Sequence, residues 1–141
     1  MKLVVLAVGK LRGAEVRALA DDYLGRLRKY GPCEEREVKR DADLAGAIPA
    51  GALVVALEVD GDPVTSTELS RRVGEWIRKD KGIVTFLVGG AEGIPREVSR
   101  RADVRLSLSP LTLPHRLARV LLLEQLYRAM TILRGEPYAR E

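Results

Sequence analysis

Two segments of the sequence combine residue types that could hold a small ligand. Residues 89–95, GGAEGIP, follow an apolar run, and their glycines let a bound molecule approach the backbone because they carry no Cβ. Residues 109–114, SPLTLP, present two leucines in a stretch that two prolines stiffen. Apolar surface beside backbone amides suits a flat ring with polar edges, such as adenine. The sequence therefore predicts that these two segments form a ligand pocket.

Each segment also has a purely structural interpretation. Glycines after a strand can make a tight turn into the next helix, and the leucines of residues 109–114 can pack under the following helix or in a seam between subunits. The glycines do not form a Gly-x-Gly-x-x-Gly motif, and no Gly-Lys-Ser/Thr motif occurs. A dinucleotide or a nucleoside triphosphate is therefore disfavoured as the ligand.

Polar side chains near the C-terminus could also take part in chemistry. His115, the only histidine, stands at the start of a predicted helix, where it could contact a phosphate or act as a base, or simply be solvated. Glu124 precedes Arg128 by four residues, the spacing of a helical ion pair. Tyr138 could stack on a base and Arg140 could hold a phosphate, unless the last residues fray.

The charge of the chain is uneven. The net charge is +4, yet residues 1–95 carry 15 basic and 15 acidic side chains, whereas residues 96–141 carry 9 basic and 5 acidic ones. A basic C-terminal third favours an anionic partner such as nucleic acid. The alternative is an arginine-rich surface that is merely solvated.

Composition narrows the classes of protein to which the chain could belong. Cys33 is the single cysteine, and no Cys or His cluster has the spacing of metal ligands, so we expect neither a disulfide framework nor a metal site. The apolar run at the N-terminus is too short for a signal peptide or a membrane span. We therefore expect a cytoplasmic protein that does not associate with membranes.

Apolar runs alternate with amphipathic segments along the whole chain. Strands are predicted at residues 3–8, 33–38 (a charged edge strand), 52–59, 83–88 and 104–108. Helices are predicted at residues 15–28, 41–48, after a capping box of Thr65 and Glu68, from Pro95, and at residues 116–133, with a turn at residues 60–63. This alternation predicts a mostly parallel α/β sheet with helices on both faces, in one domain covering residues 1–141.

The last predicted helix is apolar over more than one face. Its apolar positions are Leu117, Val120, Leu121, Leu122, Leu123, Leu126, Tyr127, Met130, Ile132 and Leu133. A helix of this kind is either central or shared with a partner, and we expect a homodimer formed through it.

Five sequence blocks resemble one enzyme family in order and spacing. They are MKLVVLAVGK, LEVDG, FLVGGAEG, LSLSPLTLPHRLARVLLLEQLYRA and PYARE. They resemble the bacterial ribosomal large-subunit pseudouridine N3-methyltransferases of the SPOUT class, from the first residue to the last. The resemblance implies a C-terminal trefoil knot, a homodimer, and S-adenosylmethionine-dependent methylation of N3 of a pseudouridine in 23S rRNA of the ribosome.

The resemblance also implies which residues act. The cofactor would be bound by Leu57, Gly89, Gly90, Gly93, Leu108, Ser109, Pro110, Leu111, Thr112 and Leu113. The RNA side would be lined by His115, Arg119, Glu124, Arg128, Tyr138 and Arg140. One departure is that Ala139 stands where the family's tail usually has a histidine, so that histidine cannot serve catalysis here.

The implied reaction transfers a sulfonium methyl group to an imide nitrogen that must first lose its proton. Positioning of two bound reactants and cationic groups that favour the imide anion would supply most of the rate, and no metal is required. His115 could accept the proton, and Arg119, Arg128 or Arg140 could stabilise the anion. Three alternatives remain open: a SPOUT enzyme that methylates a tRNA ribose hydroxyl, a non-catalytic rRNA-binding protein, and a dimeric small-ligand binder.

Overall fold

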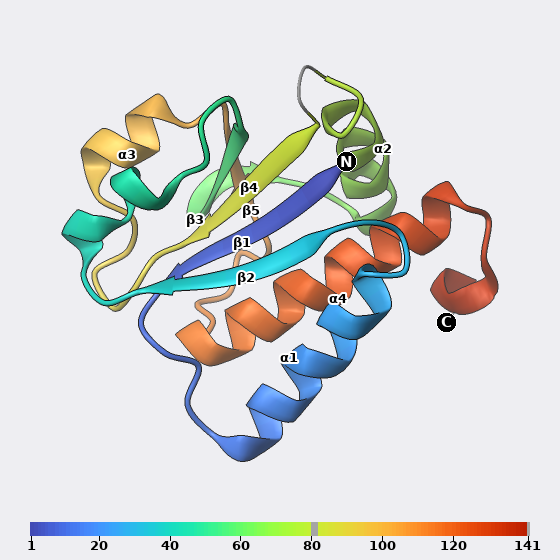
Figure 1. Ribbon diagram of the computed structural model, residues 1–141, viewed down its shortest axis with the longest axis horizontal. Coiled ribbons are helices and arrows are strands. Elements are labelled where there is room, and N and C mark those ends of the chain that lie inside the picture. Colours follow the sequence, from blue (N-terminus) through green and yellow to red (C-terminus); the bar gives the residue numbers. More distant parts are fainter. Residues whose placement is uncertain (80–81, 141) are drawn as a thin grey trace.

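A five-stranded parallel sheet forms the centre of the protein (Figure 1). The structure is a computed structural model that describes residues 1–79 and 82–140, and of residue 140 the backbone alone. The strands, in their order across the sheet, are β2 (Cys33–Val38), β1 (Lys2–Val8), β4 (Ile83–Val88), β3 (Leu53–Pro63) and β5 (Val104–Ser107). Every neighbouring pair is parallel, which confirms the predicted α/β architecture.

Helices cover both faces of this sheet unequally (Figure 1). Helices α1 (Ala14–Leu27), α2 (Ser66–Trp76) and α4 (His115–Leu133) share the larger core with one face. The short α3 (Arg96–Arg101) and two 3₁₀ turns, Asp41–Asp43 and Ala45–Ala47, lie on the other face. The short helix predicted at residues 41–48 is thus a pair of 3₁₀ turns.

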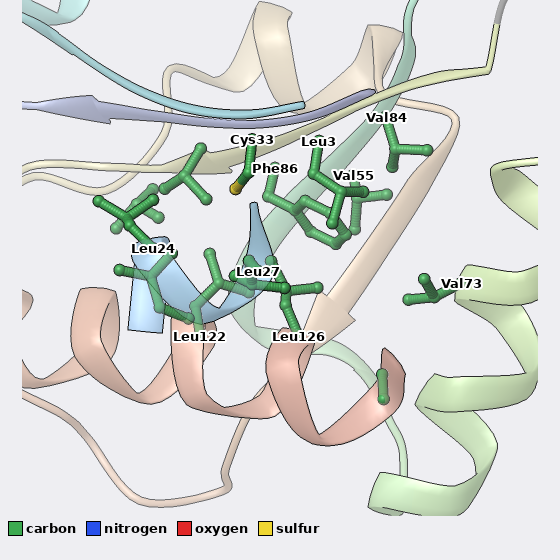
Figure 2. Packing of buried hydrophobic residues seen from close by; sticks show 14 of the residues in the cluster. Leu3, Leu24, Leu27, Cys33, Val55, Val73, Val84, Phe86, Leu122 and Leu126 are labelled. Atoms are coloured by element: carbon green, nitrogen blue, oxygen red, sulfur yellow. The ribbon is translucent and has the colours of Figure 1, made fainter. Parts of the chain in front are cut away.

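Alternation along β1 explains why the sequence shows a continuous apolar run there. Leu3 and Val5 point into the larger core, whereas Leu6 and Val8 point into the smaller one. In Figure 2 the side chains of Leu27 and Leu122 approach the sheet from α1 and α4. Because both faces of β1 are covered, residues 3–8 are apolar without interruption.

Strand β2 occupies an edge of the sheet, as its charges predict. It pairs with β1 alone, in a register that places Leu3 opposite Cys33. Cys33 is buried at the start of the strand, and removal from water raises the pKa of its thiol to about 11. This cysteine is therefore a core residue and not a reactive one.

Strand β3 does not end where the sequence suggests. The turn predicted at residues 60–63 is wrong, because β3 continues to Pro63 after an irregularity. Leu57 and Asp62 both register against Leu106 of β5, so the residues between them bulge out of the ladder. A Cβ on Gly61 would lie 2.7 Å from the backbone nitrogen of Leu106, and only glycine fits this close approach.

The cap of α2 forms as the sequence predicts, and α4 is central in the fold. Thr65 caps α2, and its Oγ1 accepts the N–H of Glu68 at 3.1 Å. Most apolar residues of α4 are buried inside the chain, because α4 packs against both α1 and α2. Three of its leucines remain exposed, namely Leu117, Leu121 and Leu133. The central place of α4 therefore accounts for most, but not all, of its apolar surface.

No helix in the described part of the chain is long and apolar enough to cross a membrane.

Candidate cofactor-binding site

A cavity of about 550 Å³ opens at the carboxyl ends of β3, β4 and β5. Ligands of parallel sheets bind at this edge, and the volume suits a nucleoside-sized molecule. Its lining consists of Leu57, Glu58, Val59, Asp60, Val88, Gly89, Gly90, Ala91, Gly93, Ile94, Leu108, Ser109, Leu111, Leu113, His115 and Ala118. The structure thus brings together eight of the ten residues expected to hold a cofactor, all except Pro110 and Thr112.

The segment after β5 forms one wall of the cavity and folds on itself. The Ser107 hydroxyl donates to the Ser109 carbonyl at 3.0 Å, and Ser109 Oγ accepts the N–H of Leu111 at 2.9 Å. Leu113 is half-buried, but Leu111 is 71% exposed at the rim. An apolar side chain held at the mouth of a cavity can be covered by a bound ligand or by a partner.

The glycine segment after β4 forms a second wall, and its three glycines differ in what they require. A Cβ on Gly89 would lie 2.4 Å from the carbonyl carbon of Gly93, so the packing of the chain itself demands glycine here. Gly93 donates its N–H to the carbonyl of Gly90 at 3.0 Å and has a φ of +79°. The tight-turn interpretation therefore holds for Gly89 through crowding and for Gly93 through its positive φ, and Gly93 also leaves open space beside the cavity.

His115 joins this glycine segment to the start of α4. Its Nδ1 lies 2.9 Å from the carbonyl oxygen of Gly89. Because a carbonyl only accepts, Nδ1 carries the proton in this contact, and in the neutral ring Nε2 is then an acceptor. Nε2 is buried and has no hydrogen-bond partner among the described residues. An unsatisfied acceptor in a residue that lines the cavity is a feature that a ligand donor would relieve.

The bulge of β3 supplies residues that the sequence interpretation missed. Glu58, Val59 and Asp60 line the cavity beside Leu57, because the irregularity carries them out of the ladder. Val59 is 60% exposed, and Leu111, which also lines the cavity, is 71% exposed. The signal available in the sequence was the acidic motif LEVDG, residues 57–61, which covers the end of the strand predicted at residues 52–59 and the start of the turn predicted at residues 60–63.

Arg119 does not lie on the surface that we expected to face RNA. Its side chain has no exposed area, and it donates from Nη2 to Glu35 at 2.7 Å and to Glu37 at 2.6 Å. Its Nη1 donates to the carbonyl of Gly9 at 3.0 Å. A guanidinium that is buried and held by two carboxylates inside the chain cannot contact an RNA base, so the expected role of Arg119 is wrong.

Glu124, Arg128 and Tyr138 lie together as a docked group. Arg128 pairs with Glu124 at 2.9 Å, as the helical spacing predicts, and its guanidinium also lies 5.1 Å from the centre of the Tyr138 ring. The Tyr138 hydroxyl donates to Glu124 at 2.8 Å. Burial, together with hydrogen bonds to Tyr23 and Glu124, raises the pKa of Tyr138 above its ordinary range. The tail therefore packs on α4 and does not fray at this residue.

Arg140 ends the short 3₁₀ segment Pro137–Arg140, and its side chain lies outside the described part of the structure.

Within the described residues, no group of three or more His, Cys, Asp or Glu side chains could hold a metal ion.

Comparison with known proteins identifies the family. A family model described as "Predicted SPOUT methyltransferase" matches residues 1–139. This chain belongs to the SPOUT methyltransferase family. It is therefore an enzyme that transfers a methyl group. The cavity at the carboxyl ends of β3, β4 and β5 belongs to such an enzyme.

Curated relatives of this SPOUT methyltransferase align over nearly its whole length. A protein named "Ribosomal RNA large subunit methyltransferase H" from Sorangium cellulosum is 51% identical, with 99% of each chain covered. A protein of the same name from Rhodospirillum centenum is 40% identical, again with 99% of each chain covered.

Solved structures support the fold of this SPOUT methyltransferase at low sequence identity. A probable methylase family protein from Haemophilus influenzae superposes with a TM-score of 0.56 at 13% identity, over 94% of this chain and 66% of that one. A second structure, reported for 2-OH methylation of C/U34 on tRNA, gives a TM-score of 0.50 at 16% identity, over 96% of this chain and 98% of that one. At these identities the likeness concerns the fold alone.

Proposed function

We propose that this SPOUT methyltransferase uses S-adenosylmethionine to methylate N3 of a pseudouridine in 23S rRNA of the large ribosomal subunit. One observation carries the substrate: 51% identity over 99% of both chains with a relative named ribosomal RNA large subunit methyltransferase H. The enzyme acts on assembled ribosomes, as a homodimer in the cytoplasm. The small α/β sheet and its helices offer little surface for gripping a lone hairpin.

The cavity residues fit this cofactor by size and chemistry. Leu57, Leu108 and Leu113 offer apolar walls for the adenine, while the open space at Gly93 leaves room for close approach to the backbone. Pro110 and Thr112 would contribute by stiffening and shaping the loop, since they do not line the cavity. When bound, S-adenosylmethionine supplies a methyl group activated as a sulfonium, so the transfer itself requires no metal.

Residues at the mouth of the cavity and on α4 would contact the RNA. The target nitrogen must be deprotonated, and nearby cations favour its anion. Arg128 and Arg140 are the candidates for this role, with Glu124 and Tyr138 orienting Arg128. His115 would hold the glycine segment through Nδ1, and Nε2 of this tautomer would accept a hydrogen bond from a ligand.

The homodimer and the knot belong to the same proposal. Leu117 and Leu121 of α4 are 47% and 37% exposed one turn apart, and Leu111 stands exposed on the adjoining segment, so a second subunit on α4 would bury them. The trefoil threading is supported by the chain leaving β5 and meeting the glycine segment again at His115.

Methyl transfer tests the proposal. Ribosomes from a strain lacking the enzyme are incubated with the protein and labelled S-adenosylmethionine, and the mark is located by mass spectrometry. Ala118→Met fills part of the cavity from α4, whereas Ala18→Met changes an exposed position of α1 and serves as the matched control. We expect a mark on pseudouridine with wild type and Ala18→Met, and a loss of at least tenfold with Ala118→Met.

Free 23S rRNA provides the second substrate in this assay. Comparable methylation of free rRNA would contradict the requirement for assembled ribosomes. Binding of S-adenosylmethionine without any label on rRNA would contradict the substrate and leave the methyltransferase assignment in place.

A further inference from the structure

The loop that joins β1 to α1 displays two cations on a buried anchor. Lys10 and Arg12 are exposed, while Leu11 between them is only 7% exposed and packs into the larger core. Gly9, at a φ of +90°, turns the chain out of the strand and donates its N–H to the Val38 carbonyl at 2.7 Å. The alternation therefore holds both cationic side chains outward.

Hydrogen bonds to Glu37 and to the buried Arg119 hold this loop in place. Glu37 Oε2 accepts the N–H of Leu11 at 2.9 Å and also accepts from Arg119 Nη2 at 2.6 Å. Arg119 donates in addition to the Gly9 carbonyl, so the loop is bonded to both α4 and β2. A loop fixed in this way presents Lys10 and Arg12 with little loss of conformational freedom on binding.

A third cation, Arg116, joins the loop from the first turn of α4. Its Nη1 lies 3.9 Å from the position that a Cβ on Gly13 would occupy, and Glu15 Oε2 lies at the same distance from that position. No carboxylate of the described residues is within ion-pair distance of Lys10, Arg12 or Arg116. Lys10, Arg12 and Arg116, together with the carboxylate of Glu15, form a cationic group with a net charge of +2.

The cationic group lies beside the mouth of the cofactor cavity. Arg116 directly follows His115, which lines the cavity. The β1–α1 loop and the start of α4 meet at the carboxyl end of the sheet, the end at which the cavity opens (Figure 1). A polyanion bound to these cations would thus be positioned next to the site of methyl transfer.

The arginines near α3 are a weaker candidate for the same role. Arg100 and Arg105 line a separate polar cavity together with the carboxylates of Asp60, Asp62 and Asp103. These carboxylates offset the positive charge there, whereas the group around the β1–α1 loop stays positive.

We propose that Lys10, Arg12 and Arg116 bind the phosphate backbone of the RNA substrate and orient it towards the cavity. This inference rests on the proposed function, because it takes RNA as the substrate of the site. The cations contact phosphates and not bases, so they contribute affinity and register but no sequence preference.

Salt-dependent binding to ribosomes tests this surface without requiring methyl transfer. The full-length protein is co-sedimented with ribosomes from a strain lacking the enzyme, at a series of KCl concentrations. The test variant is Lys10→Ala with Arg12→Ala, and the control variant is Arg71→Ala with Arg101→Ala. Arg71 and Arg101 are also exposed, lie on α2 and α3 away from the proposed RNA-facing residues, and their replacement removes the same charge.

We expect the test variant to bind ribosomes about tenfold more weakly. The slope of the logarithm of its binding constant against the logarithm of the KCl concentration should become smaller by about 1.5 to 2, because two phosphate contacts are lost. The control variant should match the wild type in both quantities. Equal behaviour of the two variants would overturn the proposal, as would wild-type binding that is insensitive to salt. Failure of the proposed function is separate, since it appears as absence of methyl transfer by a wild type that still binds.

Discussion

The guanidinium of Arg119 donates to the carboxylate of Glu37 across 2.6 Å from a position with no exposed surface. The same guanidinium reaches Glu35 and the Gly9 carbonyl, so one side chain connects α4, the edge strand β2 and the β1–α1 loop. A charge buried this deeply is tolerated because opposite charges pair with it, here through Nη2, while Nε has no partner among the described residues. The pairing therefore fixes the base of α4 relative to the loop that flanks the cavity.

Arg119→Met should lower the free energy of unfolding by about 1 to 3 kcal/mol, because it removes the hydrogen bonds to Glu35, Glu37 and the Gly9 carbonyl. Urea denaturation at fixed protein concentration measures this loss. Arg26→Met is the matched control, since Arg26 forms an exposed pair with Asp22, and it should cost less than about 1 kcal/mol. Equal stability of Arg119→Met and wild type would refute the structural role.

The acid side of the stability profile should depend on Glu37. Burial alone would raise the pKa of Glu37, but hydrogen bonds from Arg119 and the Leu11 N–H outweigh it and lower that pKa below its ordinary 4.5. A lowered pKa in the folded state contributes stability above pH 4.5 that is lost as the pH falls through the folded-state value. Between pH 5 and 3, Glu37→Gln should therefore lose less of its own free energy of unfolding than wild type loses. Parallel profiles would contradict the prediction.

Cys33 should resist thiol reagents in the native protein. With its pKa raised to about 11 by burial, about 0.1% of the thiol is ionised at pH 8, and the sulfur is shielded as well. We expect labelling by a chromogenic disulfide reagent to be at least about a hundredfold slower in buffer than in denaturing urea. Equal rates in the two conditions would show that the start of β2 opens readily.

Local patterns determined most of the fold. The buried strands, the capped α2 and the charged edge strand β2 each follow from residues close together in sequence, because periodicity and capping are local properties. The irregularity of β3 could not be predicted in this way. Whether residues 58–62 turn or bulge depends on the backbone of Leu106, which fits only because Gly61 has no Cβ.

The site shows the same division between local and distant information. Glycines and apolar loop residues indicated the cavity, since their chemistry suits a ligand wherever the chain places them. The position of Arg119 was predicted wrongly, because its partners Glu35 and Glu37 are 84 and 82 residues away in sequence. The helical pattern around an arginine does not reveal that an edge strand carries two carboxylates opposite it.

His115 should act on cofactor binding through Nδ1. Asparagine carries an N–H near the position of Nδ1 and can donate to the Gly89 carbonyl, whereas glutamine and alanine cannot keep that contact. Loss of one hydrogen bond costs about 1 to 2 kcal/mol, so His115→Ala and His115→Gln should weaken S-adenosylmethionine binding about 5- to 30-fold, measured by calorimetric titration. His115→Asn keeps the contact with Gly89 and loses only the acceptor at Nε2, so it should bind more tightly than His115→Ala, which loses both. The reverse order, with glutamine tolerated and asparagine not, would mean that Nε2 is the atom that binding requires and that the contact with Gly89 is incidental.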